Sequence, residues 1–438
     1  MASGGAGFMG EISGIICMLG ANRSMHPAKH LKFYPVVQFW CLLGLAVCAV
    51  SLRAQDIIMS APRAEAVPPF LRDQLPPAPA SLPPTPAETP FKFGSFVLHP
   101  SLSYSYMNQE GLPSADGRRI ASEVHTVSAS LSADLGQHWS LNYSPTWVTY
   151  TARAMSDSFD QSASLSGATT VRDLGIHFTE SYSNSKPTLI ETGRQTQQES
   201  WGTSLSASYS FSPKVQFQAS GNMNERNTDI ATNTRAWSSS ASLNLVFTPR
   251  ISLNLGSTFG YTEIVDAPDT YNDGYNAQVS WRPADKLSFS LSTGRQYTHS
   301  NSSAGLDLSS PLLNFSLGYQ PFETTSISLA AGRTVSPSYF KSQVTEGLQR
   351  SISLNQRLFG RFYFNASYGK SDTDYLATDT LATAGRKDSV KSYSAGLSTH
   401  LFGRLGVSAS FSKTQNGSND SGFSFSSKQY GLRLSYSF

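Results

Sequence analysis

The chain has 438 residues, of which 14% are charged, 39% hydrophobic and 11% aromatic. Soluble globular proteins carry roughly 25% charged residues, so this composition argues against an ordinary cytosolic enzyme, and the aromatic content argues against a disordered chain. The net charge is +3, but outside residues 1–54 the acidic and basic residues are equal in number, so we expect no nucleic-acid partner.

The N-terminal segment, residues 1–54, has the pattern of a signal peptide. A basic stretch at residues 29–32 precedes an apolar run at residues 33–50, and Leu52-Arg53-Ala54 follows. This order of segments is typical of secreted proteins and predicts cleavage after Ala54. Met25 directly precedes the basic stretch and is an alternative start. An uncleaved membrane anchor is the alternative interpretation of the apolar run.

Residues 55–92 are rich in proline, and we predict that they form a periplasmic linker. Ten prolines lie between Pro62 and Pro90, interleaved with alanine and leucine. Proline at this density favours extended polyproline II conformation and excludes a packed core. A spacer is the simpler interpretation. The alternative is a docking strip for a periplasmic partner or a polysaccharide.

From residue 93 to the C-terminus, apolar and small polar residues alternate with a period of two. This period is typical of strands whose two faces meet different surroundings. In residues 201–211 one face carries Trp201, Leu205, Tyr209 and Phe211, while the other carries only glycine and serine. Ten residues at about 3.3 Å each, tilted by about 40°, span roughly 25 Å, the height of a lipid-facing band. A soluble β-sandwich is the alternative, but so many strands would need several domains.

Short turns and long polar segments alternate along this region. Long segments such as 108–120 and 262–273 separate strands of about ten to twelve residues. This alternation is the strand connectivity of an outer-membrane barrel, in which the short turns lie in the periplasm. Eight turns and one further strand at each end give about eighteen strands. Sixteen is the alternative, because residues 160–183 are weakly patterned. We place the turns near Gly136, Asp173, Pro213, Pro249, Pro283, Pro321, Gly360 and Gly403.

The fold predicted for residues 93–438 is therefore all-β: a transmembrane antiparallel up-and-down β-barrel. Its expected location is the outer membrane of a Gram-negative bacterium, with outer-membrane lipid around it. The C-terminal strand has apolar residues at every second position and ends in an aromatic residue. We interpret this ending as an assembly signal read by the barrel assembly machinery through strand addition. The residues of the signal are Tyr430, Leu432, Leu434, Tyr436 and Phe438.

The opposite face of the strands predicts the character of the lumen. It carries hydroxyl and amide side chains and no ring of like charges, which suits small uncharged solutes. A barrel plugged by its own loops has the same pattern, so that alternative stays open. The clearest lumen-facing positions are Ser240, Ser242, Asn244, Ser252, Asn254, Ser288 and Ser290.

The sequence offers little chemistry beyond this lumen. All three cysteines lie within residues 1–54, the histidines are widely spaced, and no zinc or phosphate-binding motif is present. We therefore expect no catalytic residues, no cofactor and no metal. Loop aspartates such as Asp266, Asp269 and Asp273 are a calcium alternative, although acidic loop residues are more often simply solvated.

Two short segments carry a resemblance to a known group of proteins. They are Pro100-Ser101-Leu102-Ser103-Tyr104-Ser105-Tyr106 and Leu141-Asn142-Tyr143-Ser144-Pro145-Thr146, and the hairpins that end at Phe438 add to them. With these features the region from Phe96 to Phe438 resembles the β-barrel porin-2 type outer-membrane families, which are often associated with exopolysaccharide operons. The resemblance implies a pore or an export role and supplies no catalytic residues.

Three functions from different classes remain. The first is a porin-like channel for small hydrophilic, uncharged solutes. The second is a structural or export component of a polysaccharide secretion system without free diffusion, which would use the proline-rich segment. The third is an adhesin or an outer-membrane enzyme. Conductance discriminates the first from the others, and genomic neighbours discriminate the second.

Overall fold

The computed structural model describes residues 91–113, 119–189, 191, 194–301, 307–340, 342–377 and 385–438. All of these belong to one compact unit within residues 58–438. The signal peptide with its cleavage site at Ala54, and the proline-rich linker up to residue 90, lie outside the described residues and stay predictions. Among the described residues, no helix is long and apolar enough to cross a membrane.

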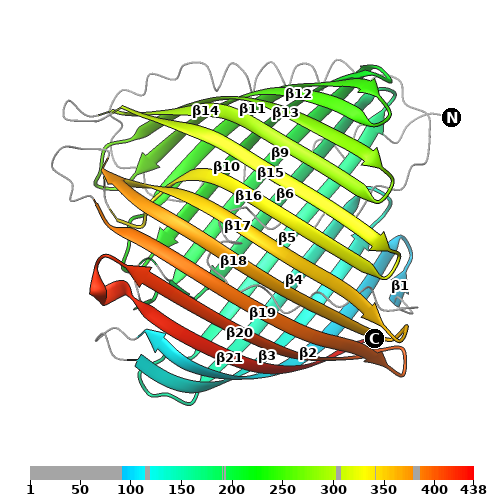
Figure 1. Ribbon diagram of the computed structural model, residues 1–438. Helices are drawn as coiled ribbons and strands as arrows, with labels where there is room; N and C mark the ends of the chain where they lie inside the picture. The colour runs from blue at the N-terminus through cyan, green and yellow to red at the C-terminus, as the bar shows by residue number, and fades with distance from the viewer. Residues whose placement is uncertain are drawn as a thin grey trace. The chain divides into compact units, whose positions relative to one another are not determined.

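Eighteen of the strands in the described residues form a closed antiparallel barrel (Figure 1). They follow one another around the ring in chain order, and the ring closes where the last strand pairs with the first, with Ser437 opposite Ser101. The predicted all-β barrel of eighteen strands is therefore confirmed, and the alternative of sixteen is wrong. The barrel strands are β2 (Phe96–Pro113), β3 (Arg119–Leu135), β4 (Trp139–Tyr150), β5 (Ser158–Val171), β6 (Leu174–Ser185), β9 (Gln198–Ser212), β10 (Val215–Thr228), β11 (Thr234–Thr248), β12 (Ile251–Ile264), β13 (Thr270–Ala284), β14 (Leu287–Ser300), β15 (Leu308–Phe322), β16 (Thr325–Pro337), β17 (Gln343–Leu358), β18 (Phe362–Ala377), β19 (Lys387–Leu401), β20 (Leu405–Ser418) and β21 (Phe425–Ser437).

Three short strands and one 3-10 helix complete the described elements. Strand β1 (Phe91–Phe93) pairs only with the start of β2, at the end of the barrel that carries the short turns. Strands β7 (Thr188–Leu189) and β8 (Arg194–Gln195) pair with each other inside the loop between β6 and β9. The 3-10 helix η1 (Ser421–Phe423) lies in the loop between β20 and β21.

All eight predicted turns are present, and six of them lie at the predicted residues. The other two come slightly later, because Pro283 and Pro321 are still within β13 and β15. The pairing register shifts next to each of these prolines, after Trp281 and after Tyr319. Proline cannot donate a ladder hydrogen bond, so an irregular strand end tolerates it where a regular ladder would not.

The strands are longer than the sequence predicts, at 12 to 18 residues in the barrel. The segment 108–120 was expected to be a loop, yet β2 continues to Pro113 and β3 begins at Arg119. Beyond the lipid both faces of a strand meet water, so the hydrophobic alternation ends there. Backbone pairing continues all the same, because each N–H and C=O group still gains a partner.

The outward face of the barrel is apolar and carries aromatic side chains at two levels. One exposed set lies beside the short turns and consists of Trp139, Phe211, Phe247, Trp281, Phe322 and Phe438. The other lies toward the long loops and consists of Trp147, Phe159, Trp201, Phe259, Tyr271 and Tyr275. Two aromatic girdles around an apolar band are the surface that a bilayer requires, and a closed ring leaves no backbone group unpaired in lipid. The protein is a barrel of the bacterial outer membrane, with the short turns in the periplasm.

This location predicts a specific behaviour on fractionation. The protein should be recovered with outer membranes, and the folded form should migrate differently from the boiled form on a gel, because a closed barrel resists unfolding by detergent without heat. Immunoblots of membrane and periplasmic fractions, boiled and unboiled, provide the measurement. Recovery as a soluble periplasmic protein would contradict the assignment.

Candidate functional site

The lumen holds a cavity of about 1800 Å³ whose lining comes from strands around the whole ring. Neighbouring strands exchange hydrogen bonds between inward hydroxyl groups, and each of the pairs Ser140–Ser166, Ser220–Ser240 and Ser367–Ser394 has an Oγ–Oγ distance of 2.7 Å. These contacts hold the wall side chains while leaving other lone pairs free for water or solute. Representative lining residues are Asn142, Ser144, Ser164, Ser200, Asn276 and Gln278.

The structure places the predicted lumen positions as follows. Ser290 lines the cavity and accepts a hydrogen bond from Gln278 Nε2 at 3.0 Å, and Ser288 shares its face of β14. On β11, Ser240, Ser242 and Asn244 share a face with the lining residue Ser238. On β12, Ser252 and Asn254 share a face with the lining residue Thr258. A contact of these residues with solute stays a prediction.

The predicted assembly signal lies on the opposite side of the wall. All five of its residues are exposed on the outward face at the end of the chain: Tyr430, Leu432, Leu434, Tyr436 and Phe438. The backbone N–H of Phe438 donates to Pro100 O at 3.2 Å, and its ring lies against Tyr436 with centroids 4.9 Å apart. The terminal residue thus contacts the seam at which the ring closes, while recognition by an assembly machinery stays a prediction.

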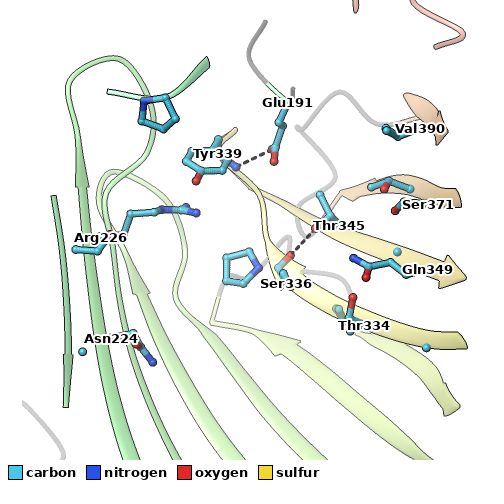
Figure 2. Close-up of a pocket in the computed structure, with 18 of the residues that line it drawn as sticks. Glu191, Asn224, Arg226, Thr334, Ser336, Tyr339, Thr345, Gln349, Ser371 and Val390 are labelled. Atoms are coloured by element: carbon cyan, nitrogen blue, oxygen red, sulfur yellow. Dashed lines mark hydrogen bonds between the residues drawn. The ribbon is translucent and has the colours of Figure 1, made fainter. Parts of the chain in front are cut away.

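We call the described residues between β6 and β9, namely 186–189, 191 and 194–197, the crossing loop. Its residue Glu191 contacts Ser338 and Tyr339, which lie in the loop between β16 and β17 (Figure 2). In the described ring, eight strands separate these two loops on one side and ten on the other. The two loops therefore meet at the mouth of the lumen, at the end away from the short turns, and the β16–β17 loop also reaches Gln198 on β9 through Tyr339.

Glu191, in the middle of the crossing loop, and its partner Tyr339 are held by several hydrogen bonds. The carboxylate of Glu191 accepts from Ser338 Oγ at 2.5 Å and from the backbone N–H of Tyr339 at 2.7 Å. Arg386 Nη1 donates to the backbone carbonyl of Glu191 at 2.7 Å, and Tyr339 Oη donates to Gln198 Oε1 at 2.9 Å. Bonds that involve an ionised group contribute about 1.5–3 kcal/mol each, so this docking is substantial.

The end of the crossing loop next to β9 is also fixed. Gln195 accepts from the backbone N–H of Ser156 at 2.9 Å and donates to the carbonyl of Ser156 at 3.2 Å. The side chains of Leu189 and Thr196 are fully buried, although both belong to a loop. The described residues of the crossing loop therefore pack against the rest of the barrel instead of extending into solvent.

Two arginines support the docking site from the wall. The Arg226 guanidinium lies 4.0 Å from the centroid of the Tyr339 ring, and its Nη2 donates to Ser338 O at 3.3 Å. Arg386 bonds the Asp388 carboxylate through Nε at 3.1 Å. A cation over an aromatic face adds stabilisation that grows as the pair loses water. The labelled side chains of Arg226, Tyr339 and Glu191 lie close together in Figure 2.

The mouth of the cavity contains charges that the sequence reasoning missed. Asp160, Lys186, Glu191, Arg226 and Asp388 all line it, whereas the inward side chains below are mostly hydroxyl and amide groups. These residues lie at strand ends or in loops, where a period of two no longer tells which side chains point inward. Cations and anions alternate here, so there is still no ring of one sign to select strongly between ions.

Burial raises the pKa of the Glu191 carboxyl above its ordinary value, against the opposing effect of the hydrogen bonds from Ser338 and Tyr339 and of the nearby Arg226 and Arg386. The docked loop therefore binds a proton more tightly than a released loop does. Docking should strengthen as the pH falls through this raised pKa, and should weaken as the pH rises through it.

We accordingly expect the mean conductance to fall on acidification from neutral pH toward the ordinary carboxyl range. Planar-bilayer recordings over this range provide the measurement, and the Glu191→Gln variant is the control because it cannot titrate. An identical pH profile in the variant and in the parent protein would show that Glu191 is not the responsible group.

No group of three or more histidine or acidic side chains in the described ranges is arranged to hold a metal ion. In the candidate calcium loop, Asp269 instead accepts from Tyr261 Oη at 2.7 Å and from the backbone N–H of Ile264 at 3.2 Å. These bonds close the loop between β12 and β13, which gives Asp269 a structural role.

Comparison with known proteins finds similarity in structure alone. No protein family and no curated protein sequence matches the chain. Among solved structures it is similar to Pseudomonas aeruginosa OccK2 (OpdF), with TM-score 0.45 and 13% identity over 78% of this chain and 98% of that one. It is also similar to the P. aeruginosa outer membrane protein OpdK (TM-score 0.44, 13% identity) and to Acinetobacter baumannii OccAB2 (TM-score 0.44, 10% identity), with the same coverage of each pair.

The class of the chain follows from its own geometry. A closed ring of eighteen described strands, an apolar outer face and a polar lumen define an outer-membrane β-barrel. The resemblance to the exopolysaccharide-associated families stays a prediction, since no family match accompanies it.

Proposed function

We propose that this barrel is a porin-like channel for small, uncharged hydrophilic solutes. The observation that carries the proposal is the cavity of about 1800 Å³, many of whose lining residues carry hydroxyl or amide groups. Such groups form hydrogen bonds with a sugar-like solute as readily as with water. A passing solute therefore replaces most of the hydrogen bonds to water that it gives up on entering the barrel. The crossing loop then sets the narrowest part of the path and limits solute size.

A structural or export component of a polysaccharide secretion system is the second candidate. The observation that favours it is the crossing loop, whose contacts with the β4–β5 loop and the β16–β17 loop hold it at the mouth of the lumen. In that role the proline-rich linker would contact a periplasmic partner or the polysaccharide, and the barrel would provide a membrane anchor.

Purified protein in planar bilayers should give discrete conductance steps with a cation-to-anion permeability ratio of about one, because the inward side chains are mostly hydroxyl and amide groups and the charges at the mouth alternate in sign. Liposome swelling should be faster with a neutral sugar than with a charged sugar acid of the same size. Absence of conductance in correctly folded protein would contradict the channel and would favour the structural role.

A further inference from the structure

The outward face of five neighbouring strands carries a row of basic side chains. Each of the strands β17 to β21 contributes one residue, and these strands are consecutive in the ring. We call this set the basic row. It consists of Arg350, Lys370, Lys391, Lys413 and Lys428.

The basic row lies directly beyond the outer aromatic level of these strands. Each basic residue is two positions closer to the loops than an outward apolar residue on its own strand. Those apolar neighbours form ring contacts across the strands, with centroids 5.0 Å apart for Tyr368–Tyr393 and 5.1 Å apart for Phe411–Tyr430. Aromatic side chains of this kind mark the level of the lipid headgroups, so the basic row faces the headgroup region of the outer leaflet. In strand order, the apolar neighbours are Ile352, Tyr368, Tyr393, Phe411 and Tyr430.

Within the row, like charges stand directly opposite each other. Arg350 is the register partner of Lys370, and Lys370 is in turn the partner of Lys391. Lys413 is the partner of Lys428. Side chains in such positions have Cβ atoms only about 4.5–5.5 Å apart, and like charges there destabilise the sheet. An external anion that binds between these cations would offset their mutual repulsion.

The chain supplies few counter-charges for the row. Asp372 contacts Lys370 at 3.0 Å, and Glu110 is the register partner of Lys428. In the described part of the chain, no carboxylate lies within ion-pair distance of Lys391 or Lys413. Elsewhere on the outer face a basic residue is paired, as Arg235 is with Glu225 at 2.8 Å. The basic row thus gathers five cations on neighbouring strands with few carboxylates beside them.

We propose that the basic row binds the phosphate groups of a phosphorylated lipid in the outer leaflet. Five strands at about 4.8 Å spacing extend the row over roughly 20 Å, which accommodates a headgroup with two or more phosphates. The apolar and aromatic surface just below the row would contact the acyl chains of the same lipid, which a free anion could not use. Binding at this sector is independent of whether the lumen conducts.

The test compares the parent barrel with a variant in which Lys391, Lys413 and Lys428 are all replaced by glutamine. The probes are vesicles of phosphatidylcholine containing lipid A with two phosphates, with one phosphate, or with none. The variant should bind the bisphosphorylated lipid at least about tenfold more weakly, since three phosphate contacts near the surface are lost. A lysine-to-arginine variant at the same three positions should bind like the parent, and so should Arg235→Gln.

Thermal unfolding separates lost binding from lost folding. In neutral detergent the glutamine variant should be at least as stable as the parent, because repulsion between like charges is removed. In bisphosphorylated lipid the parent protein should instead unfold at a higher temperature than the glutamine variant. Equal affinity of parent and variant would overturn the proposal. So would full displacement of the lipid by inorganic phosphate at an equal phosphate concentration, because the row would then be a general anion site.

Discussion

Shortening the crossing loop is expected to raise the single-channel conductance at least about twofold, because the narrowest section of a pore dominates its resistance. The change replaces residues 187–196 with a tight turn of asparagine and glycine. Ser185 and Gln198 are register partners on β6 and β9, so a short connection joins them without strain. The barrel wall itself is left intact, and only the crossing loop is removed.

A single substitution tests the contact between Glu191 and the β16–β17 loop separately. Glu191→Ala removes the acceptor of the bonds from Ser338 and Tyr339, so the crossing loop should detach from the β16–β17 loop for part of the time. We expect noisier recordings with additional higher-conductance levels. Glu263→Ala, at the loop end of β12, is the matched control, because that side chain does not line the cavity. Unchanged conductance after loop shortening would show that the crossing loop does not limit the path.

The membrane-spanning part of this fold is readable from the sequence because lipid imposes a strict rule on it. From Trp201 to Phe211 every second side chain except Thr203 is apolar, and the turn at Pro213 is short, so both features appear as periodicity. The polar wall is readable for the same reason, since residues such as Ser290 occupy the other parity. Even the strand count follows, once each turn has been located.

The crossing loop could not be predicted in this way. It depends on a contact between Glu191 and Ser338, which are 147 residues apart, and on Arg386, which reaches back to the same loop. No local period encodes such contacts, and the loop sequence alone is compatible with a solvated extracellular segment. The basic row depends likewise on register, because Lys370 and Lys391 become opposite neighbours only when β18 and β19 pair. Long-range pairing is thus the information that the structure adds.

Removing Phe438 is expected to reduce the yield of folded barrel far more than Phe247→Ala does. Both rings are outward and exposed to lipid beside the periplasmic end, so their contributions to the folded state are similar. Loss of either should cost at most about 3 kcal/mol by burial arithmetic, which a barrel with so many such contacts tolerates. Phe438 differs because it belongs to the strand that closes the ring.

Strand β21 pairs with β20 on one side and with β2 on the other, and the N–H of Phe438 bonds to Pro100 O at the seam. Until that seam forms, β21 and β2 are edges whose backbone groups would meet lipid unpaired, and an open barrel is very unfavourable there. A signal read on the terminal strand before closure would therefore act while these two edges are still unpaired.

The measurement is folded protein as a fraction of total protein, from heat-modifiable mobility in outer-membrane fractions. Unfolding of the purified, already folded variants in urea is the companion measurement, and there the two changes should have similar effects. A large loss of folded yield confined to the Phe438 deletion, with similar stability once folded, would locate its role in assembly. Equal damage from Phe247→Ala would instead mean that the terminal aromatic acts only as one more lipid contact, and that closure of the ring needs no signal at its last residue.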